Sequence, residues 1–231
     1  SFEDWQSIED GTYQNYRLMN DLDFANRKDV KTNVTIGRLE GAADGSIKTI
    51  KNINLEFDTA DNSFIKTVMY KMTNIKFENI SIINNSKSGD YSNLIRNNNG
   101  NIEDLQLENV EINADKIKYV GIIGNSSGYI NNIKMTNINV TGQHYVASLL
   151  SYSNGSNGIE NVQAENITIQ ASGNIIGGVV AYNSGNIINN IYIKDSEIEG
   201  NDTVGGVIGQ GTGYSDSSGI MNITSYDVSV K

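Results

Sequence analysis

The amino-acid sequence predicts an all-β fold, a single-stranded right-handed parallel β-helix with a short N-terminal cap of helix and strands. A motif of aliphatic and asparagine residues returns at intervals of 28 to 32 residues. Its aliphatic positions alternate with polar ones, as in half-buried strands, and its asparagine suits the left-handed backbone of a bend. One such unit cannot bury its own apolar face, so we expect stacked coils of about 28 to 30 residues.

The composition fits a single elongated domain. The chain has 231 residues with no Pro and no Cys, and all-β domains of roughly this size are common. The lack of cysteine excludes disulfides, thiolate zinc sites and cysteine nucleophiles. The 17 basic residues are scattered and the net charge is −10, which argues against a nucleic-acid partner because phosphate binding needs clustered Lys and Arg.

The N-terminal segment, residues 1–46, is predicted to cap the solenoid, and residues 47–231 are predicted to form the repeats as one continuous domain. A capping box and an apolar stripe predict a first helix, closed by Gly11, from Ser1, Phe2, Asp4, Trp5 and Ile8. Short strands at 16–18 and 22–24 lead into a first, imperfect coil made of 47–57 and 64–68. The last repeat has no such cover, and with the start at Ser1 this suggests a fragment of a longer protein.

The repeat reads Asn-Ile-x-x-x-Asn-Ile-x-Ile. Its first aliphatic residue falls at Ile75, Leu105, Ile133, Val162, Ile191 and Ile223. Four residues later stand Asn79, Asn109, Asn137, Asn166, Asp195 and Asp227. Amides stacked at the strand spacing of about 4.8 Å can hydrogen-bond to one another, so these positions predict a polar ladder along the solenoid.

Two further strands complete each predicted coil. The strand after the ladder position carries inward aliphatics at Ile80, Val110, Ile138, Ile167 and Val228. The fifth copy has Ser196 at this position, and we expect a local softening of the core there. A third strand carries the pairs Leu94/Ile95, Ile122/Ile123, Leu149/Leu150, Val179/Val180 and Val207/Ile208. A leucine-rich horseshoe would need a helical segment in each repeat, and a β-propeller would need about four strands per roughly 40 residues. Neither fold fits this repeat.

Three segments resemble the GLUG-type repeats of bacterial surface proteins, with a Val-Gly-Gly-Val-Val-Gly run, a polar turn and then Ile-x-Asn. They are 203–209, 176–187 and 119–133. The opening Phe2-Glu3-Asp4-Trp5 and the segment 15–24 resemble the lead-in to such repeats. Together these features resemble the N-terminal, non-catalytic region of immunoglobulin-A-protease-type zinc metalloproteases of Gram-positive bacteria. That resemblance implies zinc in a separate catalytic domain of the parent protein.

The chain itself shows no catalytic, cofactor-binding or metal-binding constellation. It lacks the His-Glu-x-x-His helix of those proteases, and the one histidine, His144, is predicted to face solvent in a loop. The competing enzyme class is a polysaccharide lyase or glycosidase, which needs paired carboxylates. The candidates are Glu103 with Asp104, Glu108 with Glu111, and Asp195 with Glu197 and Glu199. Acids that alternate with inward aliphatics favour a solvated outer face instead.

Two acidic segments and four tyrosines are further candidate binding residues. The Asp21-x-Asp23 pair and the Asp58–Asp61 loop offer oxygen ligands for calcium, although a bend or cap role is favoured because neither has the spacing of a dedicated calcium motif. Some of the 12 tyrosines lie near strand ends, where they form either a sugar- or protein-binding strip or the closure of apolar core ends. These are Tyr129, Tyr145, Tyr152 and Tyr182.

The sequence therefore predicts a non-catalytic β-helix module of an exported bacterial protein, located at the cell surface or in the cell wall. The expected partner is a host glycoprotein or immunoglobulin substrate, or a neighbouring protease domain. We expect a monomer with no cofactor and no nucleic-acid partner. We also expect no membrane contact, since no apolar run approaches the roughly 18 residues of a membrane span. A surface adhesin repeat and a carbohydrate-active β-helix are the alternatives.

Overall fold

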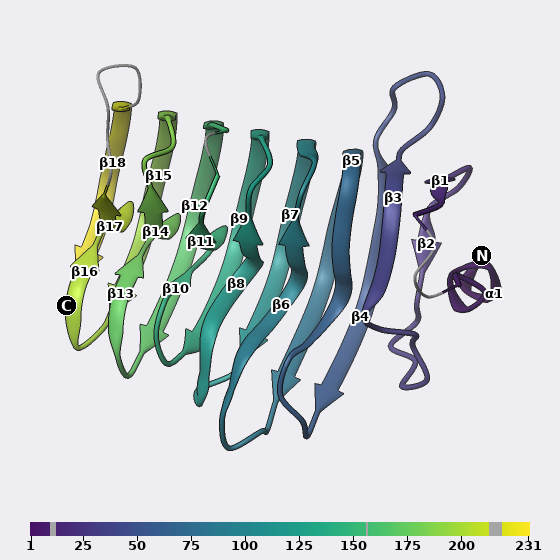
Figure 1. The fold of residues 1–231 in the computed structure, drawn as a ribbon, viewed down its shortest axis with the longest axis horizontal. Helices are drawn as coiled ribbons and strands as arrows, with labels where there is room; N and C mark the ends of the chain where they lie inside the picture. The colour runs from purple at the N-terminus through teal and green to yellow at the C-terminus, as the bar shows by residue number, and fades with distance from the viewer. Residues whose placement is uncertain (10–12, 156, 213–218) are drawn as a thin grey trace.

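The computed structural model describes residues 1–9, 13–155, 157–212 and 219–231, and it shows a parallel β-solenoid of about 7 turns with a short N-terminal helix. The coils stack along the long axis of the molecule, with helix α1 at one end and strand β18 at the other (Figure 1). The predicted β-helix is confirmed. The N-terminal elements are α1 (Phe2–Gln6), β1 (Asn15–Arg17), β2 (Leu22–Asp23) and β3 (Val34–Glu40).

Each later coil has one long side and one broken side. The long side carries the repeat motif and consists of β4 (Lys48–Phe57), the second part of β5 (Asn62–Asn84), β7 (Asn101–Asn113), β9 (Ile130–Gly142), β12 (Ile159–Ala171), β15 (Ile188–Glu199) and β18 (Ile220–Val230). Residues 62–68 of β5 belong to the other side, where they pair with β6. The other side consists of β6 (Gly89–Asn98), β8 (Ile117–Ser126), β10 (Val146–Ala147), β11 (Leu150–Ser153), β13 (Asn174–Gly177), β14 (Val180–Ser184), β16 (Asp202–Gly205) and β17 (Ile208–Thr212).

All strand pairings between coils are parallel, and their register follows the sequence repeat. Ile133 of β9 pairs with Leu105 of β7 and with Val162 of β12, while Ile191 of β15 pairs with Ile223 of β18. The repeat thus aligns identical motif positions in adjacent coils. Stacking begins before residue 47, because β1 pairs with β3, and β3 pairs with β5, in the same parallel manner.

Aliphatic columns fill the interior. Ile75, Leu105, Ile133, Val162 and Ile191 are at most 1 % exposed. The pairs predicted for the third strand are also buried from Leu94/Ile95 to Val179/Val180, whereas in the last pair Val207 is buried and Ile208 only partly so. In β18 the same columns are less covered, and Ile220 and Val230 are 44 % and 46 % exposed.

Ser196 replaces an aliphatic residue in one interior column without leaving a polar atom unpaired. Its hydroxyl accepts a hydrogen bond from the Ile167 N–H at 3.1 Å and donates to the Lys194 carbonyl at 2.7 Å. The side chain is buried. Backbone hydrogen bonds therefore compensate for the lost apolar contact at the site where we expected a softer core.

Helix α1 covers the N-terminal end of the core. Ser1 caps it in a capping box with Asp4, as predicted, but the helix ends at Gln6 with Ser7 as its C-cap. Gly11, the predicted end, lies outside the described residues. The Trp5 ring stacks on Phe64 at 4.3 Å between centroids, and its Nε1 donates to the Lys31 carbonyl at 2.9 Å.

Candidate functional site

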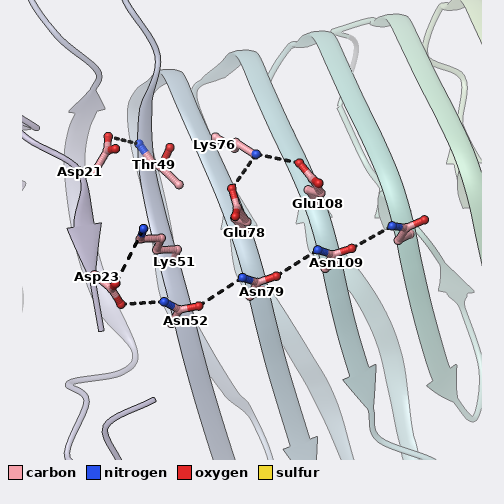
Figure 2. Close-up of polar contacts among 11 residues, drawn as sticks. Asp21, Asp23, Thr49, Lys51, Asn52, Lys76, Glu78, Asn79, Glu108 and Asn109 are labelled. Atoms are coloured by element: carbon pink, nitrogen blue, oxygen red, sulfur yellow. Dashed lines mark hydrogen bonds and ion pairs between the residues drawn. The ribbon is translucent and has the colours of Figure 1, made fainter. Parts of the chain in front are cut away.

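Six polar side chains form a hydrogen-bonded ladder on the long side of the coils, and Figure 2 shows its N-terminal part, from Asp23 to Asn109. In each step an amide Nδ2 donates to the Oδ1 atom of the preceding coil, at 2.7 to 3.2 Å. The members are Asp23, Asn52, Asn79, Asn109, Asn137 and Asn166. The five asparagines have φ between 55° and 59°, a left-handed conformation that Asn adopts at low cost. The predicted ladder is confirmed from Asn79 to Asn166 and also includes Asn52 and Asp23.

The ladder stops at Asn166. Asp195 and Asp227 occupy the next two positions with φ of 49° each, but within the described part of the chain no hydrogen bond joins them to the ladder. Ionised carboxylates have no N–H to donate, so the prediction of a ladder reaching Asp227 was wrong. Lys194 lies 3.0 Å from Asp195 and 3.3 Å from Glu165, and its hydrogen bonds with these two carboxylates raise the pKa of Lys194.

The Asp21-x-Asp23 pair lies at the N-terminal end of the ladder, where its oxygens accept hydrogen bonds. Asp21 accepts from the Thr49 N–H at 2.9 Å, and Asp23 Oδ1 accepts from Asn52 at 2.9 Å and from the Ala25 N–H at 2.8 Å (Figure 2). The bond from Asn52, and then that from Ala25, lowers the pKa of Asp23. These contacts fit the bend and cap role.

The second acidic segment, 58–61, is also tied to its neighbouring coil. Asp61 has a φ of 62°, and its Oδ1 accepts from the N–H groups of Asp90 at 3.2 Å and Tyr91 at 3.1 Å. Across the ranges that the structure describes, no group of three or more His, Cys, Asp or Glu side chains could hold a metal ion.

A second set of amide contacts, which the sequence analysis missed, runs along the first residue of the same motif. Asn74, Asp104, Asn132, Asn161, Asn190 and Asn222 all have φ between 52° and 57°. Asn132 donates to Asp104 at 2.6 Å, and Asn190 donates to Asn161 at 2.6 Å. The leading Asn of Asn-Ile-x-x-x-Asn was the signal, because it repeats as regularly as the second.

The carboxylates named for glycosidase chemistry lie on the outer surface, most of them in contact with cations or amides of adjacent coils. Glu103 lies 2.8 Å from Lys71, and Glu108 lies 2.7 Å from Lys76. Lys76 also contacts Glu78 at 2.6 Å (Figure 2), and hydrogen bonds to Glu108 and then Glu78 raise its pKa. Among the remaining candidates, Asp104 accepts a hydrogen bond from Asn132. Asp195 forms an ion pair with Lys194, and Glu197 forms one with Lys231. Glu111 and Glu199 are exposed.

Tyrosines from four coils meet on the broken side and form a cluster of half-buried rings. The members of this tyrosine cluster are Tyr91, Tyr119, Tyr145, Tyr152 and Tyr182. Three pairs stack at 4.8 to 4.9 Å between centroids, and three meet edge to face at 6.0 to 6.2 Å. Since stacked rings cover one another's faces, the cluster presents mainly ring edges and hydroxyls to solvent.

Of the four tyrosines named from the sequence, three belong to the tyrosine cluster. Tyr129 lies apart, where burial and then the charge of Glu160 raise its pKa. The other two members, Tyr91 and Tyr119, were not among the four tyrosines named from the sequence. His144 lies in a bend before β10, as predicted, but it is only partly exposed, and its Nδ1 accepts from the Asn174 N–H at 3.0 Å.

A different set of outward side chains forms no ion pair with any of the residues that the structure describes. Gln106, Lys134, Gln163 and Tyr192 occupy equivalent positions of successive coils, and we call them the outer polar column. Gln106, Lys134 and Gln163 line a hollow of about 250 Å³. Each of the four comes directly after the first aliphatic residue of the motif. This position was not among the candidate binding residues predicted from the sequence. Amide, ammonium and phenol groups in a row can hydrogen-bond a polar ligand.

Comparisons add no relative to this picture. No protein-family model, no curated protein and no solved structure matches the chain. Among the described residues, no helix combines the length and apolar character needed to cross a membrane.

Proposed function

We propose that the chain is a non-catalytic module of an exported, surface-displayed bacterial protein, serving as a rigid spacer and a binding platform. The observation that carries this proposal is the parallel stacking of the coils, in which the hydrogen-bonded ladder runs from Asp23 to Asn166. Each coil contacts only its neighbours, so such a stack holds outward side chains at fixed intervals along an extended surface. That property suits the display of a long binding face.

We further propose a zinc metalloprotease of the immunoglobulin-A-protease type as the parent protein. The support is the glycine pattern of the GLUG-like segments, which has a physical reason here. A Cβ on Gly177 would lie 1.9 Å from the Val180 carbonyl oxygen, and a Cβ on Gly205 would lie 1.9 Å from that of Ile208. Both glycines are therefore required by the same tight turn in successive coils. Zinc would belong to a separate catalytic domain, and a glycoprotein substrate or that domain would be the partner.

The complete gene of the source organism tests this proposal, together with surface labelling of intact cells by an antibody against the chain. We expect the reading frame to encode an export signal and a His-Glu-x-x-His motif with a further Glu, and the antibody to label intact cells. A reading frame with an export signal but no zinc motif would replace the protease parent with an adhesin. A frame without an export signal, with no labelling, would overturn the surface role.

A further inference from the structure

The outer polar column spans four successive coils on the long side. Gln106 is in register with Lys134, Lys134 with Gln163, and Gln163 with Tyr192. Adjacent coils are separated by about 4.8 Å, so the four side chains cover about 14 Å along the solenoid. Tyr192 is 37 % exposed, and the column thus ends at an accessible aromatic ring.

The ammonium group of Lys134 has no acidic partner among the described residues, which sets it apart from its neighbours on the same side. Lys76, in an equivalent position of an earlier coil, contacts Glu78 and Glu108 at 2.6 and 2.7 Å. Lys134 instead lies between the neutral side chains of Gln106 and Gln163. A chain with a net charge of −10 therefore displays an unpaired cation in the middle of this column.

The hollow beside the column is also lined by the exposed loop residues Gly45 and Ile47 and by Asn74, Asp104 and Asn132 of the second amide set. The carboxylate of Asp104 is already engaged, since it accepts from Asn132 at 2.6 Å and from Thr73 at 3.4 Å. Lys134 is thus the group in the hollow that remains available to an anionic ligand.

We propose that the outer polar column binds an extended uronate-containing polysaccharide lying along the solenoid. Glutamine amides both donate and accept hydrogen bonds, as sugar hydroxyls require. Lys134 would form a charge-assisted hydrogen bond with a uronate carboxylate, and Tyr192 would pack against a sugar ring. Successive sugar rings of an extended chain follow one another at an interval similar to the coil spacing. This inference rests on the proposed role as a binding platform and names its ligand class.

Calorimetric titration of the full 231-residue chain with linear hexamers of galacturonate, mannuronate and hyaluronan tests the proposal. We expect one of the three to bind, with an affinity that falls as salt is added, and to remain intact by chromatography. Its carboxyl-reduced form should bind about tenfold more weakly, a difference of about 1.4 kcal/mol, since it cannot form the charge-assisted hydrogen bond with Lys134. Lys134→Ala should lose the same factor and abolish the preference for the acidic form.

Matched variants distinguish binding at the outer polar column from a general effect of charge on binding. Gln163→Ala and Tyr192→Ala should weaken both forms of the ligand several-fold, whereas Gln170→Ala and Lys87→Ala, exposed elsewhere, should bind like the original chain. Binding of none of the hexamers, or equal losses in Lys87→Ala and Lys134→Ala at unchanged melting temperature, would overturn the inference. The gene and cell-labelling results do not depend on this titration, so failure of one proposal is distinguishable from failure of the other.

Discussion

At the level of single residues, position along a coil decides whether a side chain belongs to the core or to the surface. Ile167 is 1 % exposed in an aliphatic column, whereas Glu165, two residues earlier, is exposed and lies 3.3 Å from Lys194. Between them Asn166 turns the backbone with a φ of 59°. Of these three adjacent residues, Glu165 therefore forms an ion pair, Asn166 belongs to the ladder and Ile167 packs in the core.

Substitutions at this bend should differ sharply in cost. We expect Ile167→Asp to lower the free energy of unfolding by more than about 3 kcal/mol, because it places a charge in an apolar column. Glu165→Lys should cost less than about 1 kcal/mol, since it removes one exposed ion pair and adds a like charge near Lys194. Urea unfolding of both variants measures the difference. Equal midpoints would contradict the assigned register.

The carboxylate of Asp23 should give the chain a small acid dependence of stability. Its pKa is lowered in the folded state, mainly by the hydrogen bond from Asn52. A lowered folded pKa contributes stability above the unfolded value of about 3.9, and that contribution is lost as the pH falls through the folded pKa. Asp23→Asn keeps the acceptor oxygen but removes the charge.

The melting temperature of Asp23→Asn, measured from pH 2 to 7 beside the original chain, checks this expectation. Because Asp23 is exposed, the original chain should be more stable by only about 1 to 3 °C at neutral pH. The difference should vanish in strong acid. A difference that grows as the pH falls would show that the sign is wrong.

At the level of elements, the N-terminal helix acts as a lid on the first coil. Phe2 and Trp5 on α1 meet Phe24 edge to face at 5.6 and 5.8 Å, and Trp5 stacks on Phe64. Both helix residues are buried. These aromatic contacts cover the open end of the aliphatic columns, where exposed strand edges and apolar side chains favour association.

Trp5→Ala should uncover this end and destabilise the chain by about 3 to 5 kcal/mol. Trp5→Phe is the matched control, because it keeps an aromatic ring over Phe64 and loses the hydrogen bond to the Lys31 carbonyl. Urea unfolding gives the free energies, and light scattering reports association. If Trp5→Ala were as stable and as monodisperse as Trp5→Phe, the helix would not serve as a lid.

The sequence predicted those elements whose residues repeat at a constant offset. The aliphatic columns and the Asn79 to Asn166 steps could be predicted because a solenoid converts sequence period directly into spatial neighbourhood. Strand β3 was not foreseen, since 34–40 precedes the first clear copy of the motif. The tyrosine cluster was only partly foreseen, because Tyr119 and Tyr152 meet edge to face although they occupy different positions of the repeat, Tyr152 being in register with Asn125.

At the level of the whole molecule, the chain is a stack in which each side presents a regular surface. One side carries the Asn ladder, lysine–carboxylate pairs and the outer polar column, and another carries the tyrosine cluster. The spacing of the coils fixes the spacing of these groups. A module of this kind displays binding groups along its length, and the proposed glycan site uses that geometry.

The distance between two outward positions in distant coils tests the stacked register most directly. Ser81 is linked through Glu111, Asn139 and Thr168 to Glu197 by consecutive pairings, which makes four coil steps. In this cysteine-free chain, spin labels on Ser81→Cys and Glu197→Cys can be measured by double electron–electron resonance. Four steps of about 4.8 Å predict a narrow distribution near about 19 Å, broadened by the label linkers. A broad distribution, or one centred beyond about 40 Å, would contradict the stacked coils.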